Sequence, residues 1–347
     1  MKYPIGLQSF RLLREEGYTY VDKTAMVYSL AHNGRVYFLS RPRRFGKSLL
    51  VSTLKSYFLG EKELFKGLAI EQLETEWRKY PVFHFDFSGG LYQNSDGLDN
   101  LLDNYLLGWE KEYGVEKVHN DIGIRFINLI KAAHLQTGQR AVVLVDEYDK
   151  PLLDVMESGR TLMHEGQEMA LECHNRETLR ALYSTFKAAD EHLQFIFLTG
   201  VTKFAQVCVF SGFNQPEDIS MSAQYDTLCG LTDEELHNYF NQPIAQLAEA
   251  DGQSVDDTYI ELKKRFDGYH FSKRLKGVYN PFSLLSTLKR MEYDDYWFRT
   301  GTPTYVIRLL SHFNENLNEL VGKYYMPNQF VDYRADVEKP LPMISLN

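Results

Sequence analysis

The sequence predicts an α/β fold: an open parallel sheet flanked by helices, followed by a smaller, mainly helical domain. Short apolar runs of β-forming residues recur along the first 220 or so residues, and stretches with helical spacing separate them. Strands that alternate with helices are typical of parallel sheets with helices on both faces. Beyond about residue 228 the apolar residues keep helical spacing. We therefore expect an α/β domain over residues 1–227, with an N-terminal extension over 1–33, and a helical domain over 228–347.

The strands are expected where apolar runs end in polar or breaker residues. The second run stops at Ser88-Gly89-Gly90, a cluster that ends regular structure. The third contains consecutive apolar β-formers without alternation, which is typical of a strand buried on both faces. The expected strands cover residues 36–40, 81–87 and 194–200, and the third lies within residues 139–150 and ends in Asp146-Glu147.

Helical spacing of apolar residues predicts the segments between the strands. The expected helices cover residues 23–30, 49–58, 97–113, 122–137 and 177–190. In the last third, Thr232 followed by Glu235 predicts a helix start, because this spacing allows reciprocal capping. Several helices follow, interrupted near residues 266–271 and 279–283, and a proline-containing stretch begins at about residue 324.

A basic loop joins the first strand to its helix. It runs through Arg41, Arg43 and Arg44 to Gly46-Lys47-Ser48, which opens the helical spacing. Such a loop directs backbone N–H groups and a helix N-terminus toward one point, where a polyphosphate binds. Arg41 stands where the usual pattern has its first glycine. The residues expected to contact the nucleotide are Arg43, Arg44, Phe45, Gly46, Lys47, Ser48 and Leu49.

The third strand ends in two acids, Asp146 and Glu147. Together with Ser48, Asp146 is expected to hold Mg²⁺, and Glu147 is expected to polarise an attacking water. Lys47 is expected to reach the terminal phosphates. The alternative is that Asp146 and Glu147 are two surface acids at a strand end. This alternative is less favoured because the basic loop precedes the acids in the chain, in the order that a nucleotide site requires.

The fourth strand ends in Thr199, which we expect to sense the terminal phosphate or to orient the water; Thr202 is the second choice. A threonine that caps the strand is the alternative. Asp149 and Lys150 are expected to form a local pair without a chemical role.

The bulk composition limits which classes of protein the sequence can belong to. Of 347 residues, 44% are hydrophobic and 24% charged, which is ordinary for a water-soluble globular protein. No apolar run reaches the roughly 18 residues that a membrane span needs, and no signal-peptide core follows Met1. The three cysteines lie far apart, so we expect neither disulfides nor a zinc site, and a cytoplasmic location. The net charge of −9 argues against a nucleic-acid-binding surface.

Taken together, these motifs resemble the bacterial family of predicted AAA-ATPase-like proteins, which are P-loop NTPases. The resemblance extends over nearly the whole chain. It is carried by residues 20–24, 41–49, 145–151, 199–204, 279–283 and 296–303. It implies a P-loop NTPase sheet, and a loop rich in arginine looks like the family's own variant. Members often carry a C-terminal nuclease-like domain of the PD-(D/E)XK type, and we expect this sequence to be truncated before it or to lack it.

The expected function is an ATP-binding, Mg²⁺-dependent ATPase that acts as a conformational switch. The sequence contains no Asn-Lys-x-Asp guanine signature, which favours ATP. A nucleotide-gated interaction module that binds ATP with little hydrolysis is the first alternative, and a nucleic-acid-processing ATPase is the second. The sequence leaves open whether the chain forms a homo-oligomer or binds a protein partner, and we expect no membrane partner.

Overall fold

The computed structural model describes residues 1–156, 158–164, 166–203, 213 and 216–297. The chain divides into two compact units. The larger contains Asp22–Arg41 and Lys47–Ile219, and the smaller contains Met1–Val21, Pro42–Gly46 and the chain from Ser220 onward. The domain boundary expected at residue 227 stays a prediction.

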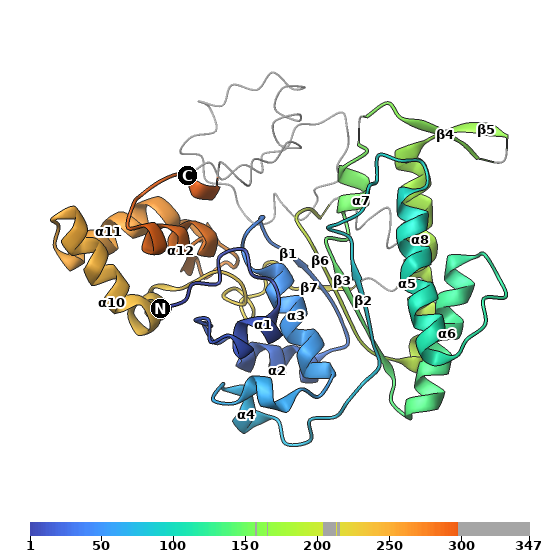
Figure 1. Cartoon of the computed structure of the whole chain (residues 1–347), viewed down its shortest axis with the longest axis horizontal. Coiled ribbons are helices and arrows are strands. Elements are labelled where there is room, and N and C mark those ends of the chain that lie inside the picture. Colours follow the sequence, from blue (N-terminus) through green and yellow to red (C-terminus); the bar gives the residue numbers. More distant parts are fainter. Residues whose placement is uncertain (157, 165, 204–212, 214–215, 298–347) are drawn as a thin grey trace. The chain divides into compact units, whose positions relative to one another are not determined.

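The larger unit is built on a five-stranded parallel sheet (Figure 1). The strand order is β2-β3-β6-β1-β7, and every neighbouring pair is parallel. The strands are β1 (Val36–Ser40), β2 (Val82–Asp86), β3 (Ala141–Asp146), β6 (Leu193–Gly200) and β7 (Glu217–Asp218). The fold class expected from the sequence is therefore confirmed, and all carboxyl ends meet at one edge.

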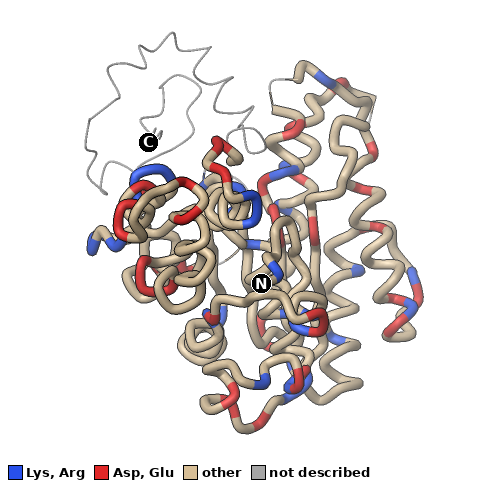
Figure 2. Tube along the Cα trace, turned by 60° about the vertical axis from the view of Figure 1, so that its left-hand side comes forward, with Lys and Arg blue, Asp and Glu red and all other residues tan. Residues whose placement is uncertain are grey.

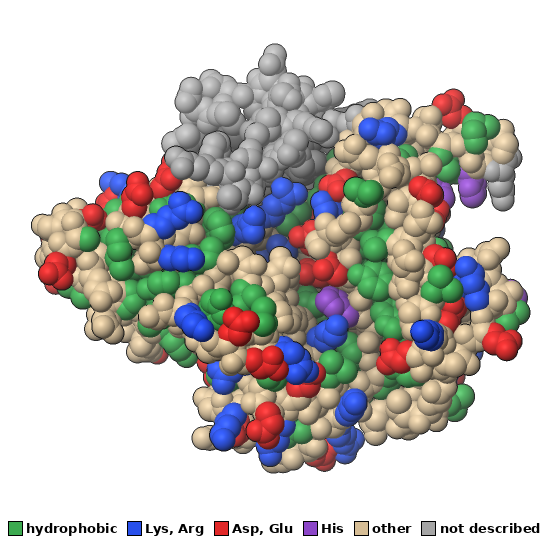
Figure 3. Space-filling model, in the orientation of Figure 1, with side chains coloured by type: hydrophobic (Ala, Val, Ile, Leu, Met, Phe, Trp, Pro, Cys, Tyr) green, Lys and Arg blue, Asp and Glu red, His purple; other side chains and the backbone are tan. Residues whose placement is uncertain are grey.

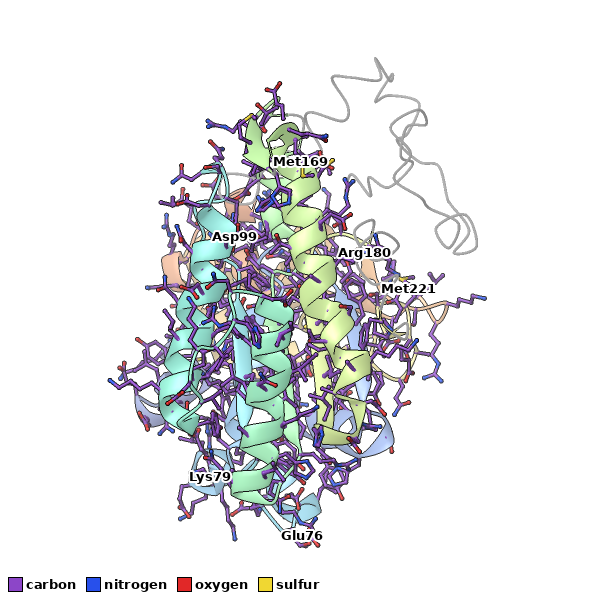
Figure 4. The ribbon with its side chains drawn as sticks, turned by 90° about the vertical axis from the view of Figure 1, so that its right-hand side faces the viewer. Glu76, Lys79, Asp99, Met169, Arg180 and Met221 are labelled. Atoms are coloured by element: carbon purple, nitrogen blue, oxygen red, sulfur yellow. The ribbon has the colours of Figure 1, made fainter. Side chains whose placement is uncertain are left out.

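Three long helices cover one face of this sheet and lie side by side in Figure 4: α5 (Gly97–Tyr113), α6 (Ile122–Thr137) and α8 (Leu171–Ala188). They bury an apolar cluster that includes Phe85, Val145 and Leu198. Local capping sets the ends of α6, since the Asp121 side chain accepts a hydrogen bond from the Ile124 amide. Burial of these apolar faces is the main source of stability for such layers.

The opposite face carries α3 (Lys47–Phe58), together with α2 (Thr24–Asn33) and the short α4 (Ile70–Leu73). The ring of Phe58 in α3 packs on Phe195 of β6 with the centroids 4.8 Å apart. Side chains alternate along a strand, so Phe197 and Thr199 lie on this same face, toward α3. Leu198 faces the three long helices instead.

Several short elements of the larger unit carry no strong sequence signal. They are η1 (Lys62–Phe65), α7 (Lys150–Leu153), η2 (Asp190–His192) and a hairpin formed by β4 (Thr161–His164) and β5 (Gln167–Ala170). The hairpin directly precedes α8, which begins at Leu171. The helix therefore starts earlier than the residue 177 expected from its apolar spacing.

The smaller unit is mainly helical. It contains α1 (Phe10–Glu15), α10 (Asp233–Asp251), α11 (Val255–Phe266) and α12 (Pro281–Arg290), with a short hairpin of β8 (Tyr269–His270) and β9 (Gly277–Val278). The predicted capping box is confirmed, since Thr232 and Glu235 exchange both hydrogen bonds at the start of α10. The proline stretch from residue 324, and residues 204 and 298–303 of the family motifs, lie outside the described residues.

Among the residues that the structure describes, no helix combines the length and the apolar character that a membrane crossing requires. Figure 2 marks charges of both signs along the elements of both units.

Candidate functional site

The carboxyl ends of three neighbouring strands form the candidate site. β6 lies between β1 and β3, so one strand separates β1 from the strand that ends in the two acids. The three strands are parallel and in close register, with Leu39 opposite Thr199 and Val145 opposite Leu198. The crevice outside the carboxyl ends of parallel strands is where ligands bind in open α/β sheets.

Lys47 and Ser48 open helix α3 at this edge. Lys47 is buried, and its Nζ donates a hydrogen bond to the carbonyl oxygen of Arg41 at 3.0 Å. The backbone turns sharply before the helix, with φ of +68° at Arg44 and +89° at Gly46. Gly46 adopts its angle without strain because it has no Cβ.

Asp146 lies within reach of this helix start. Its carboxyl group is buried, and burial raises its pKa, an effect opposed by a side-chain hydrogen bond from Ser48 and by the charge of Lys47. The Glu147 amide also donates to Asp146 Oδ1 at 3.0 Å. The structure therefore brings Lys47, Ser48 and Asp146 together through α3 and β3.

Glu147 follows Asp146 with φ of +53°, the left-handed region that non-glycine residues rarely adopt. Burial raises the pKa of its carboxyl group, and the charge of Asp146 raises it further, while Lys47 acts in the opposite direction. A strained backbone together with a perturbed acid is frequent at functional sites.

Thr199 is fully buried near the end of β6, on the sheet face that carries α3. Because Leu198 and its partner Val145 both face the long helices, Thr199 and Asp146 both point to the other side. The Thr199 Oγ1 makes no hydrogen bond within the part of the chain that the structure describes. A buried hydroxyl in this condition costs free energy unless a ligand or water satisfies it.

Asp86 and Asp149 belong to the same edge and were not assigned a role from the sequence. Asp86 ends β2 in register with Asp146, and its charge contributes to the raised pKa of Asp146. The signal for Asp86 is the acid at the end of the second apolar run. Asp149 is buried, and its carboxylate accepts hydrogen bonds from Val201 and Thr202. No sequence signal identifies those partners, which lie more than 50 positions away.

Within the smaller unit, the loop residues Arg43, Arg44 and Phe45 make packing contacts. Phe45 is buried, and its ring lies 4.7 Å from that of Tyr269, centroid to centroid. The Arg44 guanidinium lies 5.0 Å above the ring of Phe282. The backbone carbonyl of Arg43 accepts a hydrogen bond from a tryptophan side chain, the Nε1 of Trp297.

Arg41 differs from its basic neighbours in the sequence. It is 1% exposed, whereas Arg43 and Arg44 are exposed, and its Nη1 donates to the carbonyl oxygen of Ser40 at 2.9 Å. Leu49 is half-buried in the first turn of α3, where its carbonyl accepts a hydrogen bond from Thr53.

The donor set suits one kind of metal ion. No group of three or more His, Cys, Asp or Glu residues in the described part of the chain is arranged to hold a metal. Mg²⁺ does not need such a group, because it usually binds one or two carboxylates and takes its other ligands from water and substrate phosphates. A hydroxyl beside a buried carboxylate, as Ser48 and Asp146 provide, fits that requirement.

Comparison with known families settles the family. The model of a family described as "Predicted AAA-ATPase" matches residues 4–210, which contain the loop, both acids and Thr199. The chain belongs to this family. The description of the family indicates a nucleotide as the ligand.

A relative of this AAA-ATPase-like chain is an "Uncharacterized protein in vnfD 5'region" from Azotobacter chroococcum mcd 1. The two are 40% identical over 311 residues, which cover 89% of this chain and 56% of the relative. The chain thus spans little more than half the length of this curated relative.

Proposed function

We propose that this chain binds ATP with Mg²⁺ at the carboxyl edge of its sheet and hydrolyses it, using the cycle as a conformational switch. One observation carries the proposal. A buried lysine, a hydroxyl and a buried carboxylate (Lys47, Ser48 and Asp146) meet at the start of α3, on the sheet face that also holds the unsatisfied hydroxyl of Thr199. Family membership supports the same chemistry.

In this proposal the start of helix α3 binds the phosphates. The amides of Lys47 and Ser48 donate hydrogen bonds to phosphate oxygens, aided by the dipole of this 12-residue helix. The Lys47 ammonium leaves the Arg41 carbonyl for the terminal phosphates. Ser48 and Asp146 hold Mg²⁺, which neutralises phosphate charge when bound.

Glu147 is the proposed general base. Burial and the charge of Asp146 raise its pKa, which makes its carboxylate a stronger base toward a water molecule. The Thr199 hydroxyl, free of partners among the described residues, is proposed to orient the water or to contact the terminal phosphate.

Substitution of Glu147 by Gln tests the assignment. We expect Glu147→Gln to lower kcat by about 10²–10³-fold, the range for a general base, while the Kd for Mg-ATP stays within about twofold. Glu177→Gln is the control, since Glu177 is an exposed acid of α8. Equal turnover by Glu147→Gln and the wild type would remove Glu147 from the mechanism.

The wild-type protein itself decides between the alternatives. Tight Mg-ATP binding without measurable turnover would favour a nucleotide-gated interaction module. Stimulation of turnover by DNA or RNA, with salt-sensitive binding, would favour nucleic-acid processing. On the face drawn in Figure 3, acidic and basic side chains are interspersed, which does not suit a surface for a polyanion.

A further inference from the structure

The turn that follows β3 is hydrogen-bonded along its length to the chain that follows β6. The Tyr148 amide donates to the carbonyl of Thr199 at 3.0 Å, and the Tyr148 hydroxyl donates to the carbonyl of Thr202, also at 3.0 Å. Between these bonds, one carboxylate oxygen, Asp149 Oδ2, accepts three more. Its donors are the amides of Val201 (3.0 Å) and Thr202 (2.7 Å) and the Thr202 hydroxyl (2.7 Å).

These two segments are packed without room for another atom. Tyr148 and Asp149 are buried, and Gly200 lies directly against them. A Cβ at Gly200 would stand 2.5 Å from the Tyr148 ring and 2.6 Å from Asp149 Oδ1. A shift of Tyr148 or Asp149 toward β6 would therefore displace Gly200 as well.

A buried carboxylate is a costly way to make this connection. Burial raises the pKa of Asp149, an effect opposed by the Thr202 hydrogen bonds and by the charge of Lys47. Asp149 makes no ion pair with any residue that the structure describes, so its hydrogen bonds must offset the cost of burying its carboxylate. An unpaired buried charge is tolerated only where such bonds satisfy it.

We propose that Asp149 is a positioning residue, whose carboxylate clamps residues 201–202 and thereby fixes Glu147 relative to Thr199. This inference rests on the proposed function, in which Glu147 activates the water and Thr199 orients that water or contacts the terminal phosphate. Glu147 lies two positions before Asp149, and Thr199 lies two positions before Val201. One oxygen atom thus holds the segments of the base and of the hydroxyl at a fixed separation.

Asp149 does not itself touch the reacting atoms. It is 1% exposed, and Oδ2 is occupied by three donors. Its effect should appear in the rate of the chemical step, because displacement of a base by a fraction of an ångström lowers the rate without changing phosphate binding. A purely structural role would lower stability and leave the ratio of kcat to affinity unchanged.

Thr202 allows the clamp to be weakened by one bond. Thr202→Val removes the hydroxyl donor at nearly constant volume, and Thr202→Ser retains it. We expect Thr202→Val to lower kcat by about tenfold, with Kd for Mg-ATP and Tm close to the wild type, and Thr202→Ser to recover most of the rate. Thr185→Val is the matched control, because the Thr185 hydroxyl is buried but bonds only within α8, to Leu182.

A second variant and a second measurement allow the clamp to be tested independently of Thr202→Val kinetics. Asp149→Asn should lower kcat more than Thr202→Val does. Amide hydrogen exchange, measured without nucleotide, should show faster exchange at Tyr148 as well as at Val201 and Thr202 in Thr202→Val. Unchanged kcat, or kcat lost only in proportion to Tm and affinity, would overturn the inference. If the wild type shows no turnover, the proposed function fails, and unchanged exchange at Tyr148 would then overturn the clamp separately.

Discussion

The ammonium of Lys47 donates a hydrogen bond to the backbone carbonyl of Arg41, across the loop that joins β1 to α3. Both residues are buried, so the positive charge of Lys47 is held in the protein interior at the helix start. A lysine in this position is ready to exchange a neutral carbonyl for a phosphate oxygen, which gives a stronger, charge-assisted hydrogen bond.

Replacement of this lysine should therefore affect ligand binding far more than folding. We expect Lys47→Met to weaken Mg-ATP binding by at least about tenfold, since a hydrogen bond to a charged group contributes about 1.5–3 kcal/mol. Calorimetric titration measures the loss, and thermal unfolding checks the fold. Lys55→Met, at the last turn of the same helix, serves as the control. Equal weakening by both variants would indicate a general charge effect and contradict a specific contact.

His84 should make stability depend on pH. It lies on β2, its Nε2 is buried without a hydrogen bond among the described residues, and burial, followed by the charge of Lys55, lowers its pKa to about 4. The unfolded chain, with a histidine pKa near 6.5, then binds more protons than the folded chain between about pH 6.5 and pH 4. Stability should fall as the pH drops through this window, by about 2–3 kcal/mol in total.

The measurement compares urea unfolding of the wild type and His84→Gln at several pH values from 7 to 4. Because other acids also titrate there, the informative quantity is the difference between the two proteins. We expect the variant to lose less stability over the window. Parallel curves for the two proteins would show that His84 titrates alike in the folded and unfolded states.

A buried ion pair between α5 and α6 should be sensitive to the loss of one partner. Both nitrogens of the Arg125 guanidinium that face Glu110 bond its carboxylate, at 2.7 and 2.9 Å, and both side chains are about 5% exposed or less. Arg125→Met should destabilise the fold by about 3–5 kcal/mol, because it leaves a buried carboxylate unpaired. Arg180→Met should cost under about 1 kcal/mol, since its pair with Glu177 is exposed.

The double variant Arg125→Met, Glu110→Met separates charge from packing. It should regain most of the lost stability in urea unfolding, since Glu110 is gone and Asp103, which also bonds Arg125, keeps its pair with Lys117. A double variant as unstable as the single one would show that the packing of these side chains, and not their charges, supports the two helices.

The main elements could be predicted because their signals are local. The bounds of α6 agree with the sequence, since Asp121 caps its start and Gly138 ends it with a left-handed backbone. The sequence does not predict the β4–β5 hairpin, because its four-residue strands are largely exposed and show no apolar alternation. Apolar spacing consequently predicts a start of α8 that is too late, because the first turns of this helix directly follow that hairpin.

The candidate site was predictable only in part. Lys47, Ser48 and Asp146 follow from motifs at strand ends, and parallel topology then brings strand ends together. The contacts of Phe45 with Tyr269 and of Asp149 with Thr202 join positions far apart in the chain, and no local pattern encodes them. The local pair expected for Asp149 and Lys150 is wrong, since Lys150 bonds Asp154 instead.

The left-handed backbone at Glu147 has a consequence for sequence divergence. Glycine, asparagine and aspartate adopt φ near +53° at lower cost than glutamate does. In a lineage that no longer needed an acid at this position, substitution by glycine or asparagine would therefore be favoured, because either residue preserves the turn. A paralogue with asparagine or glycine directly after the strand-end aspartate could then be identified from its sequence as one that has lost the reaction.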